Sequence, residues 1–262
     1  MTTPLMSTVS DRGRAARALL CCALAALVAA RAAAQPASDE SSPPSTARHV
    51  MVEDPFNHAL LFDQFELKDT DAGTDVRWDA SAWVGHSFDR LAIRTEGNEV
   101  GGATEHAELQ LLWAHTITRW WDVVTGVRED FAPDPSRGWA AFGVQGIAPY
   151  RFDVEATAFV GDGGDSAARV KAEYELLITQ RWILQPRAEL NWYGQEDAVR
   201  GLGPGFSSSE IALRLRYEAR REVAPYVGVV RERKHGGTAD FARAAGEDPD
   251  DTRLVAGIRL RF

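Results

Sequence analysis

The sequence predicts an all-β fold, a transmembrane antiparallel up-and-down β-barrel of about 12 strands. Three observations predict it: a C-terminal segment that alternates apolar and polar residues and ends on Phe262, about twelve segments with similar alternation, and connections that are alternately long and short. Bacterial barrels have an even number of strands, short periplasmic turns and long outer loops. A periplasmic β-sandwich, the competing fold, gives no reason for connection lengths to alternate.

The C-terminal segment is expected to close this barrel. Side chains alternate across a strand, so Leu260 and Phe262 fall on one face while Arg259 and Arg261 fall on the other. The chain ends on an aromatic residue with no polar tail after it, which is typical of barrels in which the terminal aromatic residue serves as an assembly signal. We therefore expect the apolar face of residues 252–262 to contact lipid.

Residues 1–34 are expected to be a secretory signal peptide. Three arginines precede an apolar run that ends at Arg31, and residues 32–34 are small, as a signal peptidase requires. The run is shorter than the roughly 20 apolar residues of a membrane-spanning helix. Both cysteines of the chain lie inside this segment, so the mature chain has no thiol. A lipoprotein, with one of these cysteines acylated, is the alternative.

The mature chain is expected to divide into two parts. Residues 35–59 are rich in Ser, Pro and Ala and cannot form a core, which predicts a flexible periplasmic leader. Residues 60–262 are expected to form the outer-membrane barrel. Removing the signal, with its four Arg and one Asp, takes the net charge from −9 to about −12. A chain this acidic should repel nucleic acid, so we expect no nucleic-acid partner.

The barrel segments share one division between their faces. Each has apolar residues on one side and charged residues on the other, most clearly in the ranges 151–160, 169–178, 184–192 and 211–218. A tilted strand of about ten residues spans the apolar band of an outer membrane, which is about 25 Å tall. The apolar sides should therefore face lipid. The charged sides should line a wet lumen cross-linked by ion pairs, which excludes a lipocalin-like barrel.

The connections indicate the orientation. Long links are expected outside the cell, at 68–74, 97–103, 130–138, 161–167, 194–207 and 234–251. Short turns are expected on the periplasmic side, at 85–88, 116–119, 148–150, 179–181 and 219–222.

Aromatic residues are expected at both membrane interfaces, which Trp and Tyr prefer. In this topology the periplasmic girdle contains Trp120, Trp121, Tyr150, Trp182, Tyr226 and Phe262, and the outer girdle contains Phe131, Trp139, Phe159, Trp192 and Tyr193.

Several runs resemble one bacterial family. They include Trp-Asp-Ala-Ser-Ala-Trp at 78–83, Gln-Gly-Ile-Ala-Pro-Tyr at 145–150, Ile-Leu-Gln-Pro-Arg at 183–187 and Arg-Glu-Val-Ala-Pro-Tyr at 221–226. These runs resemble the copper resistance protein B family, outer-membrane barrels of bacterial copper-resistance operons, over essentially residues 51–262. The resemblance implies a non-enzymatic role in handling excess copper, with copper ions as the bound species or cargo and a periplasmic multicopper oxidase as a partner. Many members carry a Met- and His-rich leader, whereas this leader has only His49 and Met51.

Candidate copper ligands are sought among His and Met, because copper favours imidazole and thioether donors. Most of the candidates should gather at the periplasmic mouth. Met51 and His58 are expected before the first strand, His86 in an inner turn, and His115 at the inner end of the fourth strand. His106 is expected on the lumen face of the fourth strand, further from that mouth.

Two other functions remain open at this point. One is a general narrow outer-membrane pore. The other is an outer-membrane phospholipase-like barrel, which is disfavoured because no His-x-Ser-Asn-like run occurs and because the serines at 207–209 are not expected to pair with His235. The acidic run at 69–75 has the wrong spacing for a calcium loop and is expected to be a solvated turn.

Overall fold

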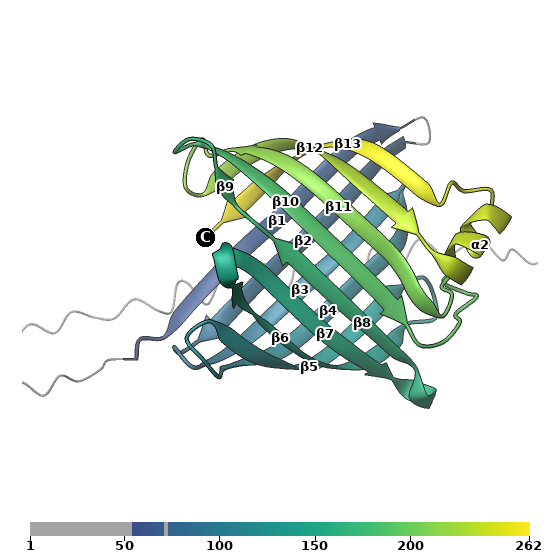
Figure 1. The fold of residues 1–262 in the computed structure, drawn as a ribbon, viewed down its shortest axis with the longest axis horizontal. Helices are drawn as coiled ribbons and strands as arrows, with labels where there is room; N and C mark the ends of the chain where they lie inside the picture. The colour runs from purple at the N-terminus through teal and green to yellow at the C-terminus, as the bar shows by residue number, and fades with distance from the viewer. Residues whose placement is uncertain (1–53, 71–72) are drawn as a thin grey trace, which may run out of the picture. The chain divides into compact units, whose positions relative to one another are not determined.

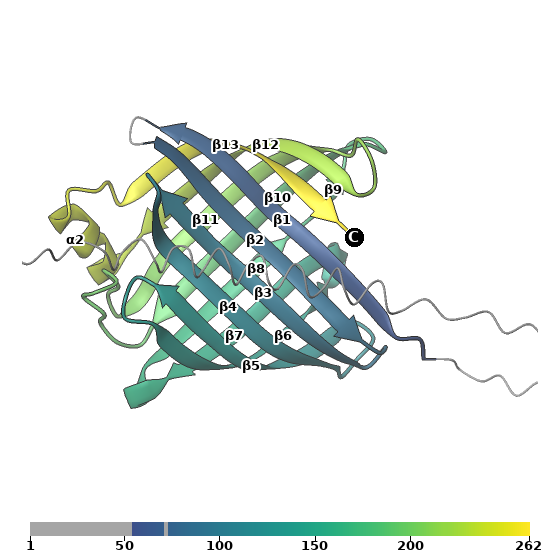
Figure 2. The same ribbon diagram turned by 180° about the vertical axis from the view of Figure 1, so that it is seen from behind.

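The chain forms a closed antiparallel β-barrel, described here for residues 54–70 and 73–262 of a computed structural model (Figure 1). Within this part the sheet has thirteen labelled strands, of which β8 (Ser166–Glu173) and β9 (Leu176–Leu177) both pair with β10 (Trp182–Tyr193). These two are halves of one interrupted strand, so the barrel has twelve. Pairing of β1 (Asn57–Thr70) with β13 (Asp250–Arg261) closes it, as Figure 2 shows from behind. The predicted fold class is confirmed.

The remaining elements follow one another around the wall. They are β2 (Gly73–Gly85), β3 (Asp89–Val100), β4 (Ala103–Thr116), β5 (Trp121–Ala132), β6 (Arg137–Ala148), η1 (Pro149–Arg151), β7 (Phe152–Gly161), η2 (Asp162–Gly164), β11 (Gly205–Tyr217), β12 (Val223–Lys234) and α2 (Gly236–Ala244). Most neighbours in sequence are neighbours in the sheet. The signal peptide and residues 35–53 of the leader lie outside the described residues. β1 begins at Asn57, three residues before the expected start of the barrel.

The interruption between β8 and β9 lies opposite a proline. Pro186 of β10 has no N–H group and cannot donate to a neighbouring strand. Tyr174 still donates from its backbone N–H to the Pro186 carbonyl, at 3.1 Å. Regular pairing then resumes where Leu176 faces Leu184. The ladder between these strands is therefore weakest at this position.

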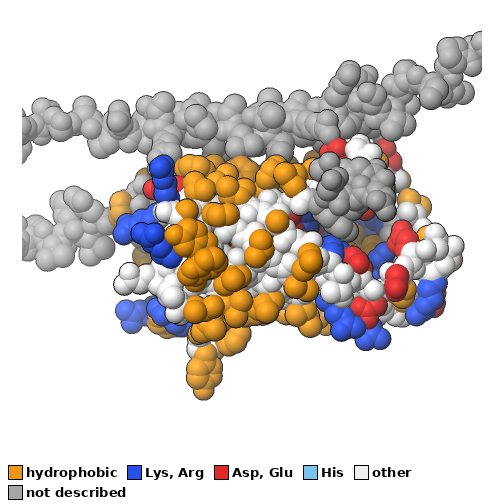
Figure 3. Space-filling view, turned by 90° about the horizontal axis from the view of Figure 1, so that it is seen from above, with side chains coloured by type: hydrophobic (Ala, Val, Ile, Leu, Met, Phe, Trp, Pro, Cys, Tyr) orange, Lys and Arg blue, Asp and Glu red, His pale blue; other side chains and the backbone are white. Residues whose placement is uncertain are grey.

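The two faces of the wall differ as the alternation predicts. Apolar side chains point outward, for example Leu254, which is 78% exposed, and they cover the middle of the view in Figure 3, with charged groups at both ends. Charged side chains such as Arg214 and Glu108 point inward and are almost completely buried. In the described ranges, every helix is too short or too polar to cross a membrane.

The expected aromatic girdles are correct only in part. Trp120, Tyr150 and Trp182 are exposed on the outside. Trp139 and Tyr226, however, are 5% exposed and point inward, where they donate hydrogen bonds to carboxylates. Phe159 is also buried, with the Arg128 guanidinium 4.8 Å from its ring centroid. The alternation of the strand decides which face a residue occupies, and height in the membrane does not.

Gly97 provides room for an aromatic ring on the outer wall. A Cβ atom at this position would lie 2.4 Å from Trp78 Cζ2 and 2.6 Å from the His106 carbonyl oxygen. The Trp78 indole also donates to Thr95 Oγ1 at 3.2 Å, which fixes the ring over the glycine.

Replacing Gly97 by valine should therefore destabilise the barrel by about 1–3 kcal/mol, the usual cost of overpacking. Urea unfolding of the refolded protein, followed by tryptophan fluorescence, measures the change. Gly138→Ala is the control, because a Cβ atom there would meet only the end of the flexible Glu129 side chain, at 3.1 Å. Equal stability of Gly97→Val and wild type would contradict the packing described.

Candidate functional site

Ion pairs cross the lumen between strands that are not neighbours. Arg77 on β2 reaches Glu210 on β11 at 2.7 Å, and Lys171 on β8 reaches Glu96 on β3 at 2.8 Å. Arg187 of β10 similarly contacts Asp79 of β2 at 3.2 Å. Each bridge spans the barrel instead of running along its wall. The predicted lumen of mixed charge, cross-linked by ion pairs, is therefore present.

Glu108 is the most heavily engaged carboxylate of this network. Its side chain is 1% exposed, and its oxygens accept from Arg128 at 2.8 Å, from Arg169 at 2.9 Å and from Gln110 at 2.7 Å. His106 Nε2 lies 3.4 Å away. A carboxylate buried this deeply is tolerated only when nearby cations and donors compensate its lost hydration.

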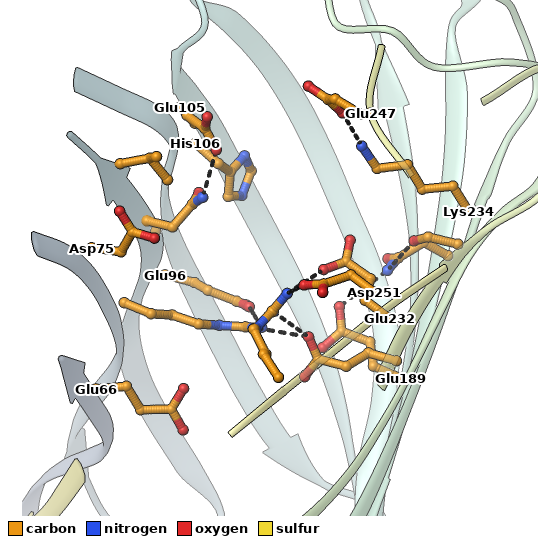
Figure 4. A pocket seen from close by; sticks show the side chains of 18 of the residues that line it. Glu66, Asp75, Glu96, Glu105, His106, Glu189, Glu232, Lys234, Glu247 and Asp251 are labelled. Atoms are coloured by element: carbon orange, nitrogen blue, oxygen red, sulfur yellow. Dashed lines mark hydrogen bonds and ion pairs between the residues drawn. The ribbon is translucent and has the colours of Figure 1, made fainter. Parts of the chain in front are cut away.

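The bridges divide the lumen into two cavities. Among the described residues, an outer cavity of about 700 Å³ and an inner cavity of about 350 Å³ share Glu96 and Arg169 in their linings. Figure 4 shows the outer cavity, with Glu96 and Glu189 near the bridges and Glu247 near the outer loops. The path along the barrel is therefore crossed by the ion pairs of β3, β4 and β8.

The outer cavity is acidic. Its lining, counted over the described residues, has eleven Asp or Glu side chains and four Lys or Arg side chains. In the same part of the chain, Glu210 Oε1 is buried without a hydrogen-bond partner. A cavity with this excess of one sign concentrates ions of the opposite sign, so it favours cations over anions.

His106 lies on the lumen face, where the sequence places it. Its ring lines the outer cavity beside Glu105 (Figure 4). His115 lies nine positions further along β4, so at about 3.3 Å per residue the two histidines are roughly 30 Å apart along the strand. His106 therefore belongs to the outer end of the barrel, away from the other candidates.

His86 and His115 both lie at the short-turn rim, the one expected to face the periplasm, and each contacts Asp89. His115 Nδ1 is 2.8 Å from Asp89 Oδ1, and the His86 backbone N–H donates to the Asp89 carbonyl at 2.9 Å. His86 Nδ1 is 3.1 Å from the Asp54 carbonyl oxygen, and hydrogen bonds from Ser87 lower the pKa of the Asp54 side chain. Both imidazoles are about half exposed, so an ion in the surrounding solvent can reach them.

The two remaining candidates are placed differently. His58 was expected before the first strand, and this is wrong: it lies in β1, opposite Val84 of β2. It is on the strand face of Leu60, away from Leu61 and Asp63, which line the inner cavity. Met51 lies outside the described residues. Within those residues, no group of three or more His, Cys, Asp or Glu side chains is arranged to hold a metal ion.

A contact that the sequence reasoning missed is the pairing of Ser209 with His235. Ser209 Oγ lies 2.9 Å from His235 Nε2, so the two side chains are in contact, although the sequence shows no recognisable nucleophile–base pair there. The signal was available in the alternation, since both residues fall on the outward faces of successive segments. What the alternation did not give was the register of β11 on β12, in which Ser209 faces Arg233.

The outer loops are tied to one another by Arg137 and Arg200. Arg137 binds Asp197 at 2.8 Å and also pairs with Asp165, while Arg200 donates to the Pro135 carbonyl. Partial burial raises the pKa of Asp197, but hydrogen bonds from the Arg200 side chain and backbone outweigh burial and leave this pKa below its ordinary value. The outer cavity is thus rimmed by cross-linked loops.

Comparison by sequence places the chain with one family. The sequence profile described as "Copper resistance protein B precursor (CopB)" matches residues 56–262. A copper resistance protein B homolog of Pseudomonas syringae pv. tomato (strain ATCC BAA-871 / DC3000) is 49% identical over 218 residues, which cover 83% of this chain and 74% of that protein. Copper resistance protein B of Escherichia coli is 44% identical over 214 residues, covering 82% and 72%.

Among solved structures, the barrel is similar to the NanC porin in a rhombohedral crystal form. The TM-score is 0.51 at 11% identity, and the match covers 78% of this chain and 100% of that one. At this identity the likeness concerns the fold alone.

Proposed function

Because the chain belongs to the copper resistance protein B family, we propose that it binds copper ions at the outer membrane and so contributes to copper homeostasis and detoxification. The observation that carries the proposal is the placing of exposed imidazoles at the barrel's periplasmic rim, together with an acidic cavity at its outer end. In this proposal copper is the cargo of the barrel and not a resident cofactor.

The periplasmic rim would provide the first copper site. His86 and His115 would supply nitrogen donors, with Asp89 and Asp54 close enough to contribute oxygen. Met51, three residues before Asp54, is the proposed thioether donor, which would favour Cu(I). His58, on the outward face of β1 near the same rim, is the weakest of the proposed ligands. Since the described residues hold no preformed three-ligand group, the ion itself would have to draw these donors together.

The outer cavity would provide a second station. Its acidic lining attracts cations, and His106 adds an imidazole beside Glu108. Because ion pairs cross the lumen between the two stations, we favour sequestration or guarded permeation over free flow. This division is also the argument against the competing function of a general narrow pore.

Binding or passing copper requires no bond in a substrate to be made or broken, so we propose no enzymatic step in copper handling. The leader would lie in the periplasm. A periplasmic multicopper oxidase is the proposed partner there, and outer-membrane lipid is the proposed surroundings of the apolar band.

We expect the double variant His86→Ala/His115→Ala to bind copper at least about tenfold more weakly, since two nitrogen donors are lost. Competition with a chromophoric chelator, carried out separately with Cu(I) and Cu(II) on the full mature chain in detergent, measures this affinity. His106→Ala in the same assay reports on the outer station.

His235→Ala is the matched control, because it removes an imidazole on the outer wall that the proposal does not use. Unchanged stoichiometry and affinity in the double variant, the His106 variant and a Met51→Ala variant would reject these copper ligands.

A further inference from the structure

Ser209 and His235 lie on the outside of the barrel, near its outer end. Ser209 follows the alternation of Ile211, which is 63% exposed on the lipid-facing side, whereas Ser208 lines the outer cavity. His235 follows directly after β12 and caps α2. The pair is therefore separated by the barrel wall from His106, the copper ligand proposed at the same end of the barrel.

The geometry of the pair is that of a nucleophile and its general base. Ser209 Oγ lies 2.9 Å from His235 Nε2, within the distance at which imidazole accepts a hydroxyl proton. The imidazole is held by Phe206, whose ring stacks on it with centroids 4.4 Å apart at 25°. The Asp250 carboxylate is paired with Arg231 on the same outer wall.

Donors for a developing negative charge are close to this pair. Helix α2 starts immediately after His235, and the first N–H groups of an α-helix have no partner within the helix. The first turn is fixed to the start of β11, because Thr238 Oγ1 lies 2.8 Å from Ser207 Oγ. Gly236 and Gly237 open this turn, and Gly237 packs against Gly203 and Pro204. Arg233 faces Ser209 across the ladder and adds a positive charge.

The surroundings indicate where the substrate would come from. Trp192 packs against Phe206, with ring centroids 5.3 Å apart, next to the stacked imidazole. Aromatic residues with one apolar and one wet side are typical of the membrane–water interface. A substrate there would have its acyl chains among the apolar residues of β11 and β12 and its polar group beside Arg233.

We propose that Ser209 and His235 form a second site on the outer wall, the nucleophile and general base of a hydrolase for carboxylic esters of lipids in the outer leaflet. The site is independent of copper and lies outside the lumen.

The reaction follows from these roles. Ser209 Oγ forms a bond to the ester carbonyl carbon while its proton moves to His235 Nε2, and the carbonyl oxygen becomes an oxyanion next to the start of α2. The intermediate collapses, the bond to the leaving alkoxide breaks, and the imidazolium returns the proton to that oxygen. Water, deprotonated by His235, then releases the fatty acid and restores the serine.

A fluorophosphonate probe on the full mature protein in detergent tests the nucleophile. We expect the wild type to be labelled on Ser209 and Ser209→Ala to be unlabelled, because the oxygen that bonds to the probe is gone; His235→Gln should be labelled at least about 100-fold more slowly, the scale of general-base catalysis. Ser208→Ala is the matched control, since its hydroxyl lies one residue away on the lumen side, and it should label like the wild type. Absence of labelling in the wild type, or equal labelling of Ser209→Ala, overturns the proposal.

Hydrolysis assays test the substrate and the base. Vesicles of phosphatidylethanolamine and phosphatidylglycerol with a labelled acyl chain should release fatty acid, and His235→Gln should abolish release at every pH while remaining folded by tryptophan fluorescence. Copper affinity should be unchanged in this variant. Cleavage of a soluble nitrophenyl ester without release from vesicles rejects the lipid as substrate, and full activity of His235→Gln rejects the base.

Discussion

Replacing Glu108 by alanine should lower the free energy of unfolding by about 3–5 kcal/mol, the usual cost of breaking a buried ion pair on one side. The variant removes a carboxylate that accepts from Arg128 and Arg169, both almost completely buried. Their guanidinium charges would then face each other without the anion between them. Urea or heat unfolding of the refolded barrel in detergent measures the loss, with cooperativity checked by two probes.

Two further variants make the result specific to the buried charge. Glu105→Ala removes an exposed carboxylate from the same strand, where it accepts only at the surface from Asn98, and should change stability by less than about 0.5 kcal/mol. Glu108→Gln keeps the size but not the charge and should fall between the two. If Glu108→Ala were as stable as Glu105→Ala, the buried ion pairs of Glu108 would contribute nothing measurable to stability, which would contradict the role assigned to them.

The second large effect is expected in the lumen. Replacing both Arg169 and Lys171 by alanine should raise single-channel conductance several-fold, because these side chains cross from β8 to carboxylates on β3 and β4. Their removal joins the outer and inner cavities. It also removes two positive charges from the lumen and leaves Glu108 with Arg128 and Glu96 with Arg77, so the widened path should prefer cations. Planar bilayer recordings with a potassium chloride gradient measure both the conductance and the selectivity.

A cation on the outer wall is the control for this experiment. Arg231 pairs with Asp250 at 2.6 Å, well away from the lumen, so Arg231→Ala should conduct like the wild type. A wild-type barrel that already conducts as well as the double variant would mean that the bridges do not obstruct the path, and the general-pore function would then be the better description.

The wall of the barrel was predictable from sequence because the alternation of apolar and polar residues within each strand shows which side chains face outward. The alternation of Leu254 and Arg253 needs no knowledge of any other strand, and neither does the length of the loop that precedes them. The same local alternation placed His106 on the lumen face. It should also have turned Trp139 and Tyr226 inward, and reading these residues by membrane height alone produced the error in the girdles.

Contacts across the barrel were not predictable in this way. The partner of Arg77 is Glu210, 133 residues later, and their meeting depends on the tilt and stagger of all strands between them. The charges therefore predicted a cross-linked lumen but not which pairs divide it. Ser209 and His235 present the same difficulty at shorter range, since their contact depends on the register of β11 on β12 and on where α2 begins.

Because of Pro186, the pairing of β10 with β8 and β9 has fewer backbone hydrogen bonds than a regular strand pair. A closed barrel has no free edge, so it can open only where the hydrogen bonds between two neighbouring strands are lost. Here the pairing with β10 is already interrupted between β8 and β9. Thermal unfolding should begin at Leu176 and Leu177, which pair with β10 over only two residues, and then spread along β10. The wall would thus open laterally toward the bilayer at the end with the short turns, while the ion pairs keep the middle of the barrel closed.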